Sequence, residues 1–386
     1  GMRINTMNAN LNESSIEQFA LDLFQSLGWE YIFGPDIAPD VEKINFGVAK
    51  RKSFEDVLLL DILEKNLKLI NPQIPDDAIH DAIKTISHLP NHFPNLMSNN
   101  EAFHRLLTEG IPVTYRKNGE EKGDIVKIID FENRENNEFH AINQFTVIEN
   151  HINKRPDIVL FVNGIPLVVI ELKNPADENA TIRSAYNQIQ TYKQTIPSLF
   201  SYNEIIVISD GLEAKIGSLS AGYDRFTAWK SMDDIYRDAM HGVSILPQLE
   251  ILIKGLFKKD TFLDFLRFFI VFDKSKAEDE SGQTIVKLTK KIAAYHQYYA
   301  VNKAVESTIR AIGINKDNWQ VKESPASYGL PDVKTQPEGD KKAGVIWHTQ
   351  GSGKSLSMVF YSAKIIQKLA NPTIVVITDR NDLDDQ

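Results

Sequence analysis

The sequence contains no cysteine among its 386 residues. Disulfide bridges, thiolate zinc sites and iron–sulfur clusters are therefore excluded, and the composition is typical of a protein in a reducing compartment. Apolar runs are also short: none approaches the roughly 20 residues that a transmembrane helix requires, and no secretory signal is recognisable. We therefore expect an intracellular, cytoplasmic protein with no membrane partner.

The sequence also lacks an excess of positive charge. Its formal net charge is −9, while 42% of its residues are hydrophobic and 25% are charged, as in ordinary globular domains. A protein that binds duplex DNA needs clustered lysine and arginine to displace counterions from the phosphates. The acidic total therefore argues against strong DNA binding by this chain alone, although a groove can be locally basic.

The most informative stretch is the apolar segment Arg155–Lys173. Two apolar runs, residues 158–162 and 165–170, flank Asn163-Gly164, a dipeptide that strongly predicts a hairpin turn. Because both runs are apolar almost throughout, both of their faces should be covered, and we expect the hairpin at the centre of a sheet. Charged residues in such a place are costly unless they are paired or bind a metal.

Three charged residues border this hairpin: Asp157, Glu171 and Lys173. Glu171 and Lys173 are two residues apart on one strand, so their side chains leave the same face. A regular two-residue turn would place Asp157 opposite Ile170 and send Glu171 to the other face. A functional site therefore requires a one-residue bulge, either in a three-residue loop at residues 162–164 or elsewhere in the hairpin.

Two carboxylates and a lysine suit metal-assisted cleavage of a phosphodiester. Asp157 and Glu171 would anchor Mg²⁺, while water and phosphate fill its remaining coordination positions. The ion would stabilise developing charge and acidify a water molecule, and Lys173 would position that water or neutralise the phosphate. Short patterns of this kind have many chance matches, so a structural ion pair at a sheet edge stays open as the alternative.

The residues Pro156-Asp157, followed by FVNGIPLVVIELK, resemble the PD-(D/E)xK nuclease domain in the motor (R) subunit of type I restriction enzymes. Residues 188–192 (QIQTY) resemble the QxxxY motif of that subfamily. By spacing alone, Gln188 and Tyr192 lie one turn apart on one helical face. The resemblance implies that both residues support the nuclease site and are needed for cleavage.

The first predicted helix covers residues 12–27, where apolar residues recur at helical spacing before Gly28. Glu17 lies on this helix, outside the apolar stripe. Many nucleases of the resembling fold carry a further acidic ligand on their first helix, and Glu17 is our candidate for that role. The alternative is a solvated surface carboxylate.

A second centre of chemistry lies further along the sequence. An apolar run at residues 343–347 predicts a strand, a Gly-rich segment follows, and residues 356–370 predict an amphipathic helix. Strand, Gly-rich turn and helix are the context of a phosphate-binding loop. Another apolar run, residues 373–377, predicts the next strand.

In such a loop, backbone N–H groups curl around the β-phosphate, a lysine bridges the β- and γ-phosphates, and a serine binds Mg²⁺. His348 stands where the strictest pattern has glycine, a position that varies among the motor ATPases of helicase superfamily 2; the alternative is a chance Gly-rich turn. Residues 295–301 resemble the Q-motif region of those motors, in which Gln297 would read the adenine edge. The loop residues predicted to contact ATP are Gly351, Ser352, Gly353, Lys354 and Ser355.

Together these features predict an α/β protein. An endonuclease domain with a restriction-endonuclease-like mixed sheet flanked by helices would occupy residues 1–230, and a helical linker with a flexible loop residues 231–286. A truncated RecA-like parallel α/β domain that binds ATP would occupy residues 287–386. A working motor also needs an acidic Mg²⁺ strand and a second RecA-like domain, so we expect no ATP hydrolysis or DNA translocation by this chain alone.

The resemblance covers nearly the whole chain and implies the N-terminal part of a restriction subunit. Such a subunit joins a Mg²⁺-dependent nuclease to an ATP-driven motor on double-stranded DNA, while methylase (M) and specificity (S) subunits choose the target. Two alternatives stay open. An orphan helicase–nuclease of DNA repair or phage defence would contain the same parts, and a non-catalytic nucleotide- or DNA-binding scaffold would contain them in inactive form.

Overall fold

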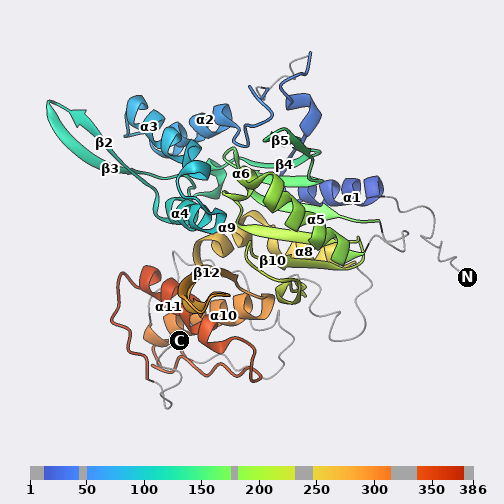
Figure 1. Cartoon of the computed structure of the whole chain (residues 1–386). Coiled ribbons are helices and arrows are strands. Elements are labelled where there is room, and N and C mark those ends of the chain that lie inside the picture. The colour runs from blue at the N-terminus through green and yellow to red at the C-terminus, as the bar shows by residue number, and fades with distance from the viewer. Residues whose placement is uncertain (1–12, 43–49, 175–180, 231–246, 314–336, 378–386) are drawn as a thin grey trace, which may run out of the picture. The chain divides into compact units, whose positions relative to one another are not determined.

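The computed structural model describes residues 13–42, 50–174, 181–230, 247–313 and 337–377. The chain divides into two compact units (Figure 1). The first comprises Gly1–Trp229 and Leu246–Ile292, and the second comprises Lys230–Ile245 and Ala293–Gln386. No described helix combines the length and the apolar character needed to cross a lipid bilayer.

The first unit is a mixed α/β domain. Its helices are α1 (Glu13–Ser26), α2 (Leu60–Ile70), α3 (Asp76–Ser87), α4 (Leu96–Glu109), α5 (Ile182–Thr195), α6 (Pro197–Phe200), α8 (Gln248–Leu256) and α9 (Lys259–Phe268). Its strands are β1 (Glu30–Phe33), β2 (Ile111–Lys117), β3 (Glu120–Val126), β4 (Phe139–Asn143), β5 (Val147–Glu149), β6 (Ile152–Lys154), β7 (Ile158–Val162), β8 (Ile165–Leu172), β9 (Ile205–Ser209), β10 (Ala214–Gly217), β11 (Ile270–Glu278) and β12 (Thr284–Ile292).

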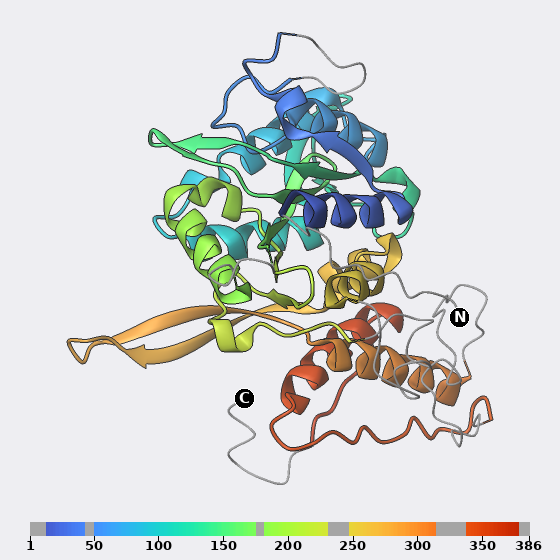
Figure 2. The same cartoon turned by 90° about the vertical axis from the view of Figure 1, so that its right-hand side faces the viewer.

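The core of this unit is a six-stranded sheet in the order β1-β4-β7-β8-β9-β10. The pairs β1–β4 and β8–β9 are parallel and the other neighbours are antiparallel, so the sheet is mixed. Helices α1 and α5 flank it from opposite sides (Figure 2). Every residue of β7 and β8 is buried, which confirms the predicted central hairpin and a mixed sheet flanked by helices.

The turn of the central hairpin contains two residues, Asn163 and Gly164, because Val162 pairs with Ile165. Both turn residues have a positive φ, 51° and 78°, as two-residue hairpin turns of this sequence require. Only glycine fits at the second position, since a Cβ there would lie 2.5 Å from the carbonyl oxygen of Leu59. The three-residue loop that we considered at residues 162–164 is therefore wrong.

The required one-residue bulge is nevertheless present, in β8. Leu160 pairs with Val168 and Phe161 with Pro166, which leaves Leu167 as the extra residue. Proline cannot donate a ladder hydrogen bond, so a bulge beside Pro166 removes the need for one.

The second half of the predicted linker is not a flexible loop. Strands β11 and β12 form a long antiparallel hairpin (Figure 2), and only residues 279–283 turn the chain. The Asp279 carboxylate accepts hydrogen bonds from the N–H groups of Ser281 and Gln283, which fixes that turn. The polar composition predicts disorder, but a continuous antiparallel ladder, from the pair Ile270 and Ile292 to the pair Glu278 and Thr284, orders the segment. Residues 231–246 of the predicted linker lie outside the described residues.

The second unit contains α10 (Tyr295–Ile312) and α11 (Lys354–Lys368), which pack against each other. Residues 343–347 and 373–377, predicted as strands, do not pair with any strand among the described residues, so the expected parallel sheet is not formed there. A strand persists only when a neighbour supplies its ladder hydrogen bonds. Both segments are exposed; Val345 is 94% and Trp347 85% accessible.

Candidate active site

The bulge in β8 brings the two acidic residues of the hairpin face to face. Because Ile158 pairs with Ile170, the next residues along the ladder, Asp157 and Glu171, lie opposite each other. Their exposed fractions are 7% and 2%. Oδ2 of Asp157 accepts a hydrogen bond of 2.7 Å from the backbone N–H of Leu172, which fixes the carboxylate toward the end of β8.

This placement disfavours two ionised carboxylates. Burial, and then the charge of Glu171, raises the pKa of Asp157 to about 8. Burial also raises the pKa of Glu171. Oε2 of Glu171 is buried and has no hydrogen-bond partner among the described residues. The pair therefore has a strong preference for a bound proton or cation.

Lys173 supplies one positive charge at this position. Its Nζ lies 2.8 Å from Oε1 of Glu171. Burial disfavours the charged ammonium, but Glu171, with smaller contributions from Asp157 and Glu13, outweighs this effect, and the pKa of Lys173 is raised. Lys173 is therefore an ammonium ion at neutral pH, able to donate hydrogen bonds but not to accept a proton.

Helix α5 places the predicted QxxxY residues on the sheet beside these acids. The helix begins after Thr181, whose side chain caps it by accepting a hydrogen bond from the N–H of Ser184. Tyr192 is buried, and burial, followed by the Glu171 and Asp157 carboxylates, raises the pKa of its hydroxyl. Gln188, half-buried one turn earlier, interacts with that hydroxyl.

Glu17 on α1 is held near the same end of the sheet. Its two carboxylate oxygens accept hydrogen bonds from the side-chain amides of Asn143 and Gln144, each 2.6 Å long. The backbone N–H of Gln144 in turn donates to the carbonyl oxygen of Asp157, at 2.9 Å. Glu17 is therefore tied to the chain beside Asp157 and is not a freely solvated carboxylate.

A second acidic residue of α1 escaped the sequence analysis. The charge of Glu13 contributes to the raised pKa values of Asp157, Glu171 and Lys173, which places its carboxylate within electrostatic reach of all three. Glu13 lies one turn before Glu17 on the same helical face, and this spacing is the signal that could have identified it.

The residues present fit a divalent cation. Within the described part of the chain, no three acidic or histidine side chains are already gathered as metal ligands. Two opposed carboxylates, one with an unpartnered buried oxygen, nevertheless form the hard oxygen donor set that Mg²⁺ prefers, with water and substrate completing its coordination.

In the second unit, the Gly-rich segment that was predicted to bind phosphate leads directly into a helix. Gly351 and Gly353 have φ values of 79° and 82°, and α11 begins at Lys354 directly after the second glycine. Such a loop aims N–H groups and the positive end of a helix dipole at one point. Ser352 and Ser355 lie in the same segment, on either side of that helix start.

Two side chains close this loop. Nζ of Lys354 donates to the carbonyl oxygen of His348 at 3.0 Å. Gln297 is buried, and its amide nitrogen donates to the carbonyl oxygen of Gly353 at 3.0 Å, while its oxygen accepts from the N–H of Ala294 at 2.9 Å. Gln297 thus fixes the Gly-rich segment to the start of α10.

Comparison with known proteins agrees with this organisation. Residues 10–225 match the family described as type I restriction enzyme R protein N terminus, and residues 296–386 match the SWI2/SNF2 ATPase family. The chain is 42% identical, over 97% of its length and 32% of the relative, to the type I restriction enzyme HindI endonuclease subunit of Haemophilus influenzae.

It is also 35% identical to a protein of Methanocaldococcus jannaschii provisionally named as the type I restriction enzyme MjaIXP endonuclease subunit, over 98% of this chain and 34% of that protein. The chain thus spans about a third of the length of these curated relatives. Because the first family match covers more than half of the chain, the chain belongs to the family of the type I restriction enzyme R protein N terminus.

Proposed function

We propose that the first unit is a Mg²⁺-dependent endonuclease domain of the PD-(D/E)xK type, acting on double-stranded DNA as part of a restriction subunit. The observation that carries this proposal is the opposition of Asp157 and Glu171 across a buried strand pair, with Lys173 2.8 Å from Glu171. In this hairpin, Asp157 lies opposite Glu171 only because of the bulge. The bulge itself does not require acidic residues at these positions, so their presence supports a chemical role.

Asp157 and Glu171 would hold Mg²⁺, and Glu17 or Glu13 would contribute a further carboxylate through water. A bound ion would stabilise charge on the phosphate and acidify a water molecule. Lys173, which is protonated, would donate a hydrogen bond to a non-bridging phosphate oxygen and neutralise the charge that develops there. Tyr192 would keep the Glu171 carboxylate in its orientation.

The second unit would bind ATP through Gly351, Ser352, Gly353, Lys354 and Ser355. In a complete subunit we propose that this region belongs to an ATP-driven DNA translocase in the cytoplasm, working with methylase and specificity subunits. The names of the relatives as type I restriction enzyme endonuclease subunits support this assignment. We expect this chain alone to show no ATP turnover, and measurable hydrolysis would contradict that expectation.

The test compares Glu171→Ala and Lys173→Ala with the unaltered sequence in the complete subunit, assayed for Mg²⁺-dependent nicking of supercoiled DNA. Each substitution should reduce cutting roughly 10²-fold or more, because each removes charge stabilisation at the phosphate. If cutting survives both changes, the nuclease site lies elsewhere.

A further inference from the structure

The bulge at Leu167 is hydrogen-bonded to the residue that precedes β9. The carbonyl oxygen of Leu167 accepts a hydrogen bond of 2.7 Å from the backbone N–H of Glu204, the residue that precedes β9. The extra residue of a bulge has no partner in the ladder on the bulged side, here with β7. A hydrogen bond to the strand on the other side, here β9, can therefore hold it in place. The position of Glu204 therefore bears directly on the bulge.

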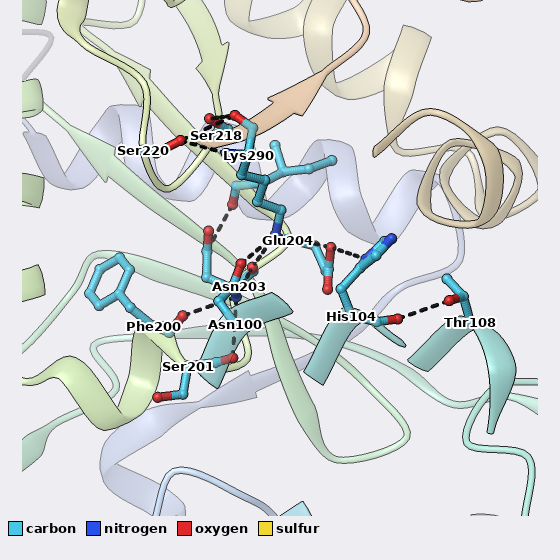
Figure 3. A network of polar contacts seen from close by, with 11 residues as sticks. Asn100, His104, Thr108, Phe200, Ser201, Asn203, Glu204, Ser218, Ser220 and Lys290 are labelled. Carbon is cyan, nitrogen blue, oxygen red and sulfur yellow. Dashed lines mark hydrogen bonds and ion pairs between the residues drawn. The ribbon is translucent and has the colours of Figure 1, made fainter. Parts of the chain in front are cut away.

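The side chain of Glu204 is fully buried and lies between the side chains of Lys290 and His104 (Figure 3). Its Oε2 lies 3.1 Å from Nζ of Lys290 and 2.8 Å from Nδ1 of His104. A carboxylate in such a dry place is kept charged only by close partners. Burial acts against ionisation, but His104 and Lys290 outweigh it and lower the pKa of Glu204.

All three N–H groups of the Lys290 ammonium have an acceptor. Besides Glu204, they reach Oδ1 of Asn100 at 2.9 Å and the carbonyl oxygen of Asn203 at 2.7 Å. Asn100, on α4, also donates to the carbonyl of Asn203 at 2.7 Å. Lys290 thus bonds both residues that lead into β9: Asn203 through its carbonyl oxygen and Glu204 through its side chain.

The main chain of Lys290 is fixed as well. Its carbonyl oxygen accepts hydrogen bonds from the hydroxyls of Ser218 at 2.7 Å and Ser220 at 3.2 Å, and its N–H donates to Oγ of Ser220 at 2.8 Å (Figure 3). A lysine anchored at both ends cannot follow a displacement of β9 without breaking several bonds at once.

We propose that Lys290 and Glu204 are positioning residues that hold the bulge at Leu167 and so keep Asp157 opposite Glu171, a role that rests on the proposed nuclease function. The competing arrangement is built into the hairpin. With the same two-residue turn and no bulge, Asp157 would face Ile170, and Glu171 would point to the other side of the sheet.

The bulged and the regular registers of β7 with β8 differ in two measurable ways. In the observed one, the two carboxylates can share a divalent cation, and the N–H of Leu172 is protected by its bond to Asp157. Loss of the bulge would weaken cation binding and expose that N–H to exchange. A general loss of stability would accelerate exchange of all the amides of the sheet together, whereas loss of the bulge accelerates exchange at Leu172 beyond that of its neighbours.

The experiment uses the 386-residue chain with the double substitution Glu204→Gln/Lys290→Met, which removes both charges and leaves neither one unpaired. Mn²⁺ binding is measured by calorimetry, and amide exchange at Leu172 by NMR. We expect Mn²⁺ affinity to fall roughly tenfold or more, and Leu172 exchange to accelerate more than exchange of the other amides of β8 and β9.

The matched control is Asn71→Ala, in the same unit. Asn71 is buried and its side chain bonds both the N–H and the carbonyl of Lys127 at 2.8 Å, so its removal lowers stability without touching β8. This variant should bind Mn²⁺ like the unaltered chain.

Unchanged Mn²⁺ affinity and unchanged Leu172 exchange in the double variant would overturn the positioning role. If the unaltered chain binds no Mn²⁺ but Leu172 exchange still accelerates, the proposed nuclease site fails and the positioning of the bulge stands. Should the double variant not fold, Ser218→Ala/Ser220→Ala, which loosens only the main chain of Lys290, carries the same expectation for both measurements.

Discussion

The backbone N–H of Leu172 donates a 2.7 Å hydrogen bond to Oδ2 of Asp157, the residue directly before the neighbouring strand β7. This bond fixes the orientation of a carboxylate that would otherwise rotate, and it spans the strand pair at the point where Glu171 faces Asp157. An oxygen is needed for the bond, but a charge is not. The structural and chemical roles of Asp157 can therefore be separated by mutation.

The substitution Asp157→Asn should leave the fold intact and reduce Mg²⁺-dependent DNA cleavage by the complete subunit roughly 10²-fold or more. The amide oxygen still accepts from Leu172, while the negative charge that attracts the cation is lost. Cleavage rates and circular dichroism check the two halves of this expectation. The control is Glu213→Gln, which neutralises an exposed carboxylate; comparable losses in both variants would contradict the assignment.

The stability of the metal-free chain should decrease as the pH rises from about 4 to about 8. The pKa of Asp157 is raised from 3.8 to about 8 on folding, so in this window the folded state binds more protons than the unfolded state. By linkage, the free energy of unfolding falls with increasing pH. Other groups also titrate, so the relevant quantity is the difference in the free energy of unfolding between the Asp157→Asn variant and the unaltered chain.

We would measure that difference by urea denaturation at pH 5 and pH 8. Relative to the unaltered chain, the variant should be more stable at pH 8 than at pH 5. Added Mg²⁺ should reduce the shift, because the cation stabilises the ionised pair. A difference independent of pH would mean that Asp157 is ionised throughout.

Replacing Tyr192 with phenylalanine should lower DNA cleavage about 10- to 100-fold while changing stability little. The ring keeps its packing, but the hydroxyl beside Glu171 is removed. Tyr186→Phe is the matched control on the same helix, since its hydroxyl contacts the carbonyl of Ala221 at 3.4 Å and lies away from the acidic pair. Equal effects of the two substitutions would refute a supporting role for Tyr192.

In the Gly-rich segment of the second unit, Gly353→Ala should destabilise that unit by about 1 kcal/mol more than Gly351→Ala. Both glycines have positive φ, so both variants carry backbone strain. Only at Gly353 would a new Cβ also meet Nε2 of Gln297, at 2.5 Å, and displace its hydrogen bond; around Gly351 nothing lies within 4 Å. Thermal unfolding and ATP affinity measure the contrast, and equal losses would argue against a structural role for Gln297.

Sequence patterns were sufficient to predict the central hairpin, since Asn163-Gly164 and two apolar runs specify both its turn and its burial. They did not locate the bulge. Pro166 was the available signal, because a residue without an N–H group in a central strand demands an irregular ladder. The bond that holds Leu167 comes from Glu204, which is remote in sequence, and no local pattern reports such a contact.

The hairpin of β11 and β12 was missed for a different reason. Its acidic, glycine-containing middle has the composition of disordered sequence, and neither strand shows a regular alternation of apolar and polar residues. The burial of Lys290 was equally hidden, because an isolated lysine in a polar stretch is normally solvated. Its three acceptors come from parts of the chain that meet only in the folded domain.

The two extended apolar segments of the second unit affect how this chain can be handled in the laboratory. Residues 343–347 and 373–377 contain valine and isoleucine, carry no charge, are exposed and have no strand partner among the described residues. Segments of this kind add readily to identical segments of other molecules. We expect concentrated preparations to self-associate through them, and replacing Val345 and Val375 with lysine should keep the chain monomeric without disturbing the first unit.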